Sequence, residues 1–193
     1  MDLYIVAGPN GSGKSTFIND FIEIFNKKYI LINADSIAHE KFGYIKDEKE
    51  KYKKAFSYAE ELMNKAFNEK KDILIETVNS STHKDDFYKK CKDAGYLIHF
   101  FYIATDDPNI NIARVCGRVS EGGHNVPEEK VRERYYKSLD RILYSWNIAD
   151  TMYLYDNSHS ELRLCVYAVK ADNYLVKMIP HWVRKYFIDK VDI

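Results

Sequence analysis

The sequence predicts an α/β fold of three layers, in which helices cover both faces of a parallel sheet. Along the 193 residues, short apolar runs alternate with longer segments whose apolar residues recur at helical spacing. The first apolar run passes directly into a glycine-rich loop and then into a helical segment. No linker or break in composition interrupts the chain. We therefore expect a single domain over residues 1–193.

The first half of the chain alternates between strand and helix. Leu3–Ala7 is a continuous β-rich run, as expected for a strand that is buried on both faces. Residues 14–28 place apolar side chains on one helical stripe, and residues 29–32 form a second short strand. Residues 47–70 have the i, i+3, i+4, i+7 pattern of a long amphipathic helix, and residues 72–78 predict the third strand.

The second half continues this alternation. Residues 85–92 predict a helix, and residues 96–104, the most hydrophobic run, predict a central strand. Helices over 108–118 and about 127–146 each begin at a proline, which is favoured at the first helical position. The remaining elements expected are a fifth strand at 151–155, and then a C-terminal extension at about 160–193 with a β-hairpin (162–169 and 174–178) and a helix from about residue 180.

The most specific motif is the segment of residues 8–16, GPNGSGKST, which we call the P-loop. It matches GxxxxGK[ST] between a predicted strand and a predicted helix. Glycines let successive N–H groups turn inward around a phosphate, and the helix adds its positive end. The motif predicts the P-loop nucleoside triphosphate hydrolase or kinase fold, with ATP and Mg²⁺ as cofactors.

The expected nucleotide-binding residues are Gly8, Asn10, Gly11, Ser12, Gly13, Lys14, Ser15, Thr16 and, after the fifth strand, Asn157. Lys14 would contact the β- and γ-phosphates as a catalytic residue, and Ser15 would ligate Mg²⁺.

Two carboxylates follow predicted strands, at the sheet edge where the P-loop lies. Asp35 is the candidate base that accepts the proton of an attacking hydroxyl, and Glu76 is the candidate ligand of Mg²⁺ or of the substrate. We expect Asp35, Glu76 and the adjacent Thr77 to contact the substrate, in a pocket formed with residues 36–46 and 78–83. Two alternatives stay open: Asp35 could be a helix N-cap, and Glu76 could activate water in a hydrolysing ATPase.

Arginines cluster around one glycine turn. The chain has seven arginines, and four of them, Arg114, Arg118, Arg132 and Arg134, flank Gly122-Gly123. Because arginine clamps phosphates with a planar fork, this arrangement predicts a closing lid at about 114–134. The alternative is that these arginines pair with nearby glutamates on the helix surface. We expect His124, in the same turn, to hydrogen-bond to the loop backbone.

Composition excludes some functions. The 29 basic and 29 acidic residues cancel, which argues against a protein that binds bulk nucleic acid by charge alone. No apolar run approaches the length of a membrane span, and the N-terminus shows no leader pattern. We therefore expect a cytoplasmic protein with no membrane partner.

These motifs resemble a known family. GPNGSGKST, INAD, a strand ending in ET, GGHNVPEEKVRERYYKSL and YDNS are similar to segments of the compact bacterial zeta toxin-like P-loop kinases, often labelled predicted ATPases, over roughly residues 1–158. The resemblance implies phosphorylation of a hydroxyl of UDP-N-acetylglucosamine, with Asp35 as base. It also implies ATP and Mg²⁺ binding at residues 11–16, and Arg118 and Arg134 as catalytic arginines. An antitoxin protein would be a partner.

The function that we expect is that of a small-molecule kinase with an alcohol acceptor, most simply a nucleotide-sugar. One alternative is a polynucleotide-end kinase, which would need a basic groove beside Asp35, where residues 36–46 supply only Lys41 and Lys46. Another is a regulatory module that binds or hydrolyses ATP. The kinase is distinguished from that module if its turnover of ATP depends on an added acceptor.

Overall fold

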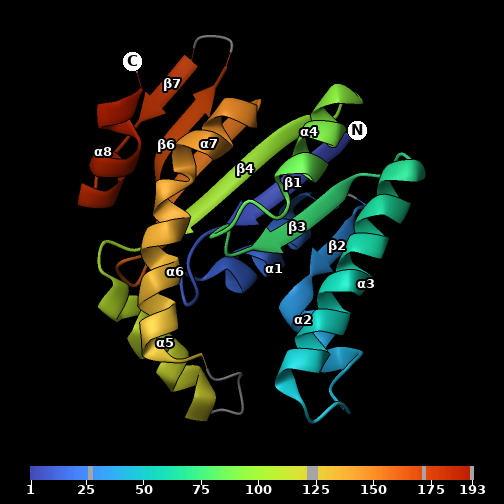
Figure 1. The fold of residues 1–193 in the computed structure, drawn as a ribbon. Coiled ribbons are helices and arrows are strands. Elements are labelled where there is room, and N and C mark those ends of the chain that lie inside the picture. Colours follow the sequence, from blue (N-terminus) through green and yellow to red (C-terminus); the bar gives the residue numbers. More distant parts are fainter. Residues whose placement is uncertain (26–27, 121–125, 171–172, 192–193) are drawn as a thin grey trace.

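The computed structural model describes all residues except 26–27, 121–125, 171–172 and 192–193. In the described part of the chain, one sheet of seven strands has the order β2-β3-β1-β4-β5-β6-β7 (Figure 1). The strands are β1 (Asp2–Ala7), β2 (Ile30–Asn33), β3 (Ile73–Thr77), β4 (Leu97–Ala104), β5 (Thr151–Asp156), β6 (Arg163–Val169) and β7 (Asn173–Val176). The strands β2, β3, β1, β4 and β5 are parallel, whereas β6 and β7 pair antiparallel. The predicted fold class and its C-terminal hairpin are confirmed.

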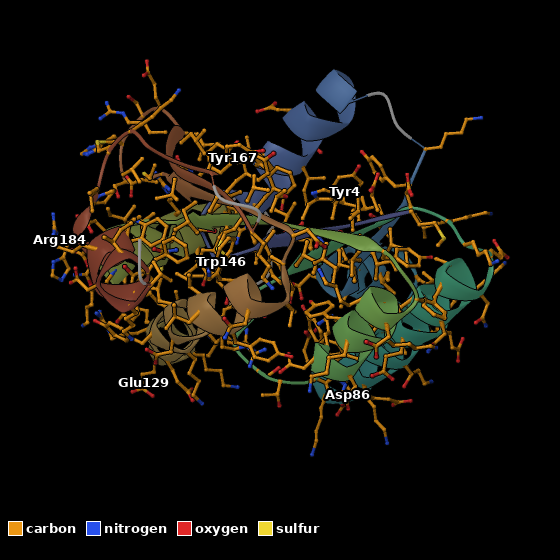
Figure 2. The ribbon with its side chains drawn as sticks, turned by 90° about the horizontal axis from the view of Figure 1, so that it is seen from above. Tyr4, Asp86, Glu129, Trp146, Tyr167 and Arg184 are labelled. Carbon is orange, nitrogen blue, oxygen red and sulfur yellow. The ribbon has the colours of Figure 1, made fainter. Side chains whose placement is uncertain are left out.

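Helices cover both faces of this sheet. They are α1 (Lys14–Phe25), α2 (Ala34–Glu40), α3 (Glu48–Asn68), α4 (Asp85–Asp93), α5 (Pro108–Ser120), α6 (Glu128–Asp140), α7 (Ile142–Ile148) and α8 (His181–Tyr186), with a short 3₁₀ turn, η1 (Ile188–Lys190). Figure 2 shows α1 on one face of the sheet and α3, α4 and α6 on the other. The three layers expected from the sequence are therefore present.

The first strand shows why the central sheet is apolar throughout. Leu3 and Ile5 point into the larger core cluster, whereas Tyr4 and Val6 point into the smaller cluster that contains Ile18 of α1. All of these side chains are buried. A parallel strand with helices on both faces has no side that contacts water, so its sequence does not alternate between apolar and polar residues.

Two helix predictions need correction. The helix expected at 127–146 is two helices, α6 and α7, separated at Arg141. The N–H of Arg141 bonds to the carbonyl of Ser138, which is the tighter spacing of a 3₁₀ turn, and its guanidinium forms an ion pair with Asp85. This tertiary contact gives no periodic pattern in the sequence. The short helix α2 begins directly after β2, and the sequence indicated it only through the alternative that Asp35 caps a helix.

Candidate active site

The P-loop connects β1 to α1 in a backbone conformation that requires glycine. Gly8 has φ +144°, and a Cβ at this position would lie 1.9 Å from the carbonyl oxygen of Ile103. Gly13 has φ +96°, and its Cβ would lie 2.4 Å from Nδ2 of Asn157. Both φ values lie where side chains are disfavoured. The loop is therefore packed closely against the ends of β4 and β5.

Two asparagines support the loop from neighbouring elements. Nδ2 of Asn111, in α5, donates to the carbonyl oxygen of Asn10 at 2.7 Å. Nδ2 of Asn157, after β5, donates to the carbonyl oxygen of Ser12 at 2.8 Å. The structure thus places Asn157, predicted to bind nucleotide, against the loop backbone.

Polar atoms of the loop are buried without a protein partner. Among the described residues, Oδ1 of Asn10 and Oγ of Ser12 are buried and accept or donate no hydrogen bond. Buried polar groups are normally paired, so these two atoms mark a place where a polar ligand fits. This is the fit expected of a loop that binds phosphate.

Lys14 lies at the centre of the site and is buried. Its Nζ donates a 2.8 Å hydrogen bond to the carbonyl oxygen of Pro9. Burial lowers the pKa of Lys14, the carboxylates of Glu76 and Asp35 raise it, and the guanidinium of Arg118 lowers it, with a net decrease. The charges of these predicted site residues therefore act on one ammonium group.

Glu76 connects the P-loop to the neighbouring strand end. Its carboxylate accepts hydrogen bonds from Oγ of Ser15 at 3.1 and 3.3 Å, and from Nδ2 of Asn33 at 2.7 Å. The register of β2 and β3 places Asn33 directly opposite Glu76. A hydroxyl beside a carboxylate is a donor set that suits Mg²⁺ or its water shell. Thr16, the residue after Ser15, is exposed on α1.

Asn33 is a site residue that sequence reasoning missed. Its Oδ1 accepts hydrogen bonds from the N–H groups of Asp35 (2.9 Å) and Ser36 (3.1 Å), so Asn33 is the N-cap of α2. The alternative that Asp35 caps this helix is wrong. Asp35 lies in the first turn with an exposed side chain. The usable signal was asparagine, a favoured N-cap, directly after a strand.

Thr77, predicted to contact substrate, makes a local contact within the protein. Its Oγ1 accepts a hydrogen bond from the N–H of Asn79 at 3.1 Å. Asn79 has φ +55°, so the chain turns sharply after β3. Thr77 therefore shapes this turn, with its side chain half-buried.

The four arginines of the predicted lid differ in their surroundings. Arg114 donates to the carbonyl oxygen of His159 at 3.5 Å, and Arg132 donates to Oδ1 of Asn109 at 2.8 Å. Arg118 is exposed at the end of α5 and acts on Lys14, as described above.

The charge of Arg134 acts on a different side chain. Tyr52, in α3, has a pKa raised to about 12 by burial and by Asp35 and Glu48, while Arg134 lowers this pKa. The charge of Arg118 thus acts on Lys14, and the charge of Arg134 acts on Tyr52, on which Asp35 acts too. Gly122, Gly123 and His124 lie outside the described residues.

A pocket of about 250 Å³ lies between α3 and α4, beside Glu76. It shares Glu76 and His83 with the pocket that the sequence predicts for the substrate, and its other lining residues include side chains of α3 and α4. It is lined by Ile32, Ala34, Phe56, Ala59, Glu60, Met63, Asn64, Glu76, His83, Lys84, Asp86, Phe87 and Lys90. We call it the α3–α4 pocket.

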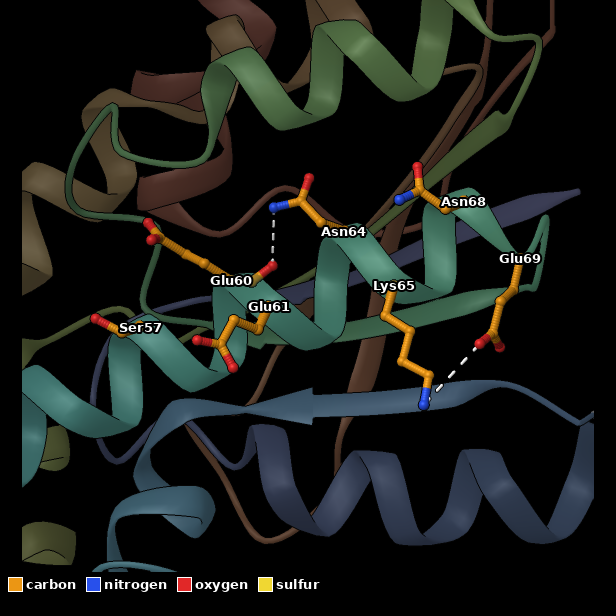
Figure 3. Close-up of a pocket in the computed structure, with 7 residues that line it drawn as sticks. All are labelled: Ser57, Glu60, Glu61, Asn64, Lys65, Asn68 and Glu69. Atoms are coloured by element: carbon orange, nitrogen blue, oxygen red, sulfur yellow. Dashed lines mark hydrogen bonds and ion pairs between the residues drawn. The ribbon is translucent and has the colours of Figure 1, made fainter.

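A second hollow lies along α3 alone (Figure 3). Two contacts between its lining residues stay within α3 and its C-terminal end: Lys65 pairs with Glu69 at 4.0 Å, and Nδ2 of Asn64 donates to the carbonyl oxygen of Glu60 at 3.0 Å. The residues lining it come from one helix and include none of the P-loop. It has no converging groups that indicate a binding site.

Solved structures share this architecture. A chain from the PezAT toxin–antitoxin system of Streptococcus pneumoniae has a TM-score of 0.64 and 21% identity, over 81% of this chain and 67% of that one. The AvrRxo1-ORF1:ORF2 complex with ATP contains a chain with a TM-score of 0.75 and 13% identity, over 100% of this chain and 65% of that one. Shikimate kinase from Acinetobacter baumannii has a TM-score of 0.50 and 15% identity, over 83% and 85% of the two chains. These similarities show the P-loop kinase fold.

Sequence comparison agrees with this fold. An uncharacterized protein from Haemophilus influenzae is 31% identical over 132 residues, which are 66% of this chain and 88% of that protein. In the described part of the chain, the helices are too short or too polar to cross a membrane.

The sequence model of the zeta toxin family matches residues 2–159. With the P-loop, the strand-end carboxylates and this match together, the chain belongs to the zeta toxin family.

Proposed function

We propose that this protein is an ATP-dependent kinase that phosphorylates a hydroxyl of a small molecule, with a nucleotide-sugar such as UDP-N-acetylglucosamine as the first candidate. One observation carries the proposal. Hydrogen bonds lead from Ser15 of the P-loop to Glu76, from Asn33 to Glu76, and from the N–H of Asp35 to Asn33. This path fixes the start of α2, and therefore Asp35, relative to the phosphate-binding loop.

The proposed reaction assigns a role to each group. Asp35 accepts the proton of the acceptor hydroxyl while the oxygen of that hydroxyl forms a bond to the γ-phosphorus. The bond between this phosphorus and the oxygen bridging to the β-phosphate breaks, and ADP leaves. Lys14, Arg118 and Arg134 stabilise the negative charge of the transferring group. Because the side chain of Asp35 is exposed, an acceptor can reach its carboxylate.

The residues present also fit a divalent cation. Ser15 and Glu76 would hold Mg²⁺, which when bound supplies positive charge to the phosphates. In the described residues, no group of three or more His, Cys, Asp or Glu side chains forms a metal site. A cation at Ser15 and Glu76 would therefore take its other ligands from water and phosphate, as is usual for Mg²⁺.

The test is phosphorylation of a panel of nucleotide-sugars with ATP and Mg²⁺, using wild type, Asp35→Asn and, as a matched control, Asp93→Asn, an exposed aspartate on α4. We expect a phosphorylated sugar with wild type and the control, and a loss of about 100-fold or more with Asp35→Asn. Equal rates for wild type and Asp35→Asn would refute Asp35 as the base. Phosphorylation of oligonucleotides instead, or ATP turnover without an acceptor, would favour the polynucleotide kinase or the hydrolytic module.

We also propose an antitoxin as a protein partner. The support is that the PezAT relative belongs to a toxin–antitoxin system. Induced expression should then arrest the growth of the host cell, and Asp35→Asn should relieve the arrest. Unimpaired growth with active wild-type protein would contradict this partner.

A further inference from the structure

The α3–α4 pocket joins an apolar interior to a charged rim. Ile32, Ala59 and Met63 contribute buried or nearly buried apolar side chains to it. Glu76, which also accepts the hydrogen bond from Ser15, lines the same pocket. The pocket therefore shares Glu76 with the proposed site of phosphoryl transfer, and its concave apolar interior suits the body of an acceptor.

Most of its charged groups have a partner. His83 contacts Glu60 at 2.9 Å. Lys90 donates to Oδ1 of Asn64 at 3.3 Å and lies 4.2 Å from the centre of the Phe67 ring. These groups line the rim of the pocket, and they already have partners within the protein.

Lys84 differs from these neighbours. Its side chain is half-buried at the start of α4, and among the described residues no hydrogen bond or ion pair of its ammonium group is found. Burial lowers the pKa of Lys84, while the carboxylates of Asp35 and Glu60 raise it, with a net decrease. A partly desolvated cation without a direct partner is costly, and an anionic ligand group would compensate for this cost.

We propose that Lys84 binds an anionic group of the acceptor, a phosphate or a carboxylate, while the rest of the acceptor occupies the α3–α4 pocket and its hydroxyl reaches Asp35. This inference rests on the proposed kinase function. Glu60, Glu76 and Asp86 line the pocket together with its cations, so the lining as a whole does not attract a polyanion. The acceptor class is thus a small molecule with one localised anionic group, not a polynucleotide.

The experiment compares acceptors that differ in charge. The probes are UDP-N-acetylglucosamine, N-acetylglucosamine 1-phosphate, glucuronate and neutral N-acetylglucosamine. Lys84→Gln should raise KM for the anionic acceptors about 10- to 100-fold, the worth of one hydrogen bond between charged groups, and leave KM for ATP unchanged. Lys84→Arg should restore most of the affinity, and Lys89→Gln, an exposed lysine on the same helix, should match wild type.

Binding by calorimetry provides a readout without turnover. Wild type should bind UDP-N-acetylglucosamine at least about 10-fold more tightly than Lys84→Gln does. Equal binding by the two proteins, equal use of neutral and anionic acceptors, or an equal loss in Lys89→Gln would overturn the role of Lys84. If binding depends on Lys84 but no acceptor is phosphorylated, the kinase proposal fails and the anion site stands. Thermal unfolding of each variant checks that it folds.

Discussion

Nε1 of Trp182, in α8, donates a 2.9 Å hydrogen bond to Oδ1 of Asp156, at the end of β5. Both side chains are buried, with exposed fractions of 1% and 3%. The same carboxylate oxygen accepts a hydrogen bond from Oγ of Ser158 at 2.7 Å, and Asn157 between them donates to the P-loop. Trp182 lies beyond the segment that the family model matches. The C-terminal extension therefore supports the strand end that contacts the P-loop.

Replacing Trp182 by phenylalanine removes this donor and part of a buried ring. We expect the free energy of unfolding to fall by about 2–4 kcal/mol, because a buried carboxylate loses a hydrogen bond and a small cavity forms. ATP affinity should fall as well, since Asn157 follows Asp156 directly. Urea denaturation followed by circular dichroism measures the first effect and calorimetry the second. Tyr186→Phe, a change on the same helix, is the control, and equal behaviour of the two variants would contradict the prediction.

Glycines with positive φ should differ in their sensitivity to alanine. At Gly95, with φ +84°, a Cβ meets nothing within 4 Å, so Gly95→Ala should cost only the backbone strain, about 1–2 kcal/mol. At Gly8, a Cβ would collide with the backbone of Ile103, which cannot rotate away. Gly8→Ala should cost about 3 kcal/mol or more and abolish ATP binding. The measurement is urea denaturation of both variants, and equal costs would refute the close packing of the P-loop.

The fold could be predicted because its information is local. Continuous apolar runs such as Leu3–Ala7 belong to strands buried on both faces, and the pattern in 47–70 is that of one amphipathic helix. The break at Arg141 could not be predicted, since it accompanies an ion pair with Asp85, which is distant in sequence. Contacts between residues that are distant in sequence leave no periodic pattern in the sequence.

The site divides in the same way. Lys14 and Ser15 follow from a contiguous motif, and Glu76 follows from its position at a strand end. By contrast, Asn33 contacts Glu76 across 43 positions of sequence, and Asn111 contacts the P-loop across 101. These supporting residues depend on strand register and on helix docking, which composition and spacing do not encode.

Asp150 should make stability depend on acidic pH. Burial opposes ionisation of its carboxyl, but the N–H of Ile98, at 2.8 Å, and the ammonium of Lys92 outweigh burial and lower the pKa of Asp150. A carboxylate with a lowered pKa stabilises the fold above its ordinary pKa of about 4, and this contribution disappears as pH falls through the lowered value. The difference in unfolding free energy between wild type and Asp150→Asn should be constant from pH 6 to 8 and shrink below about pH 4. A difference that persists undiminished at pH 2 would contradict this assignment.

The buried charge of Lys14 should destabilise the fold, although the same charge serves ATP binding. Its side chain is 7% exposed, and burial lowers the pKa of Lys14 although Glu76 and Asp35 oppose this effect. A lowered lysine pKa means that the protonated group destabilises the fold at neutral pH, and that this penalty is relieved as pH rises past the folded pKa. Without ATP, Lys14→Met should therefore unfold at a higher temperature than wild type at pH 7, and the gap should narrow toward pH 10.

With ATP and Mg²⁺ the order should reverse. Wild type gains stability by binding nucleotide, whereas Lys14→Met lacks the ammonium that contacts the phosphates, so its melting temperature should not respond. Phosphoryl transfer should fall by about 100-fold or more, since a charge that stabilises the transition state is lost. Thermal unfolding at pH 7 and pH 10, with and without ATP, separates the two effects. A Lys14→Met variant that is less stable than wild type at pH 7 without ATP would show that the hydrogen bond from Lys14 to Pro9 outweighs the cost of burying the charge.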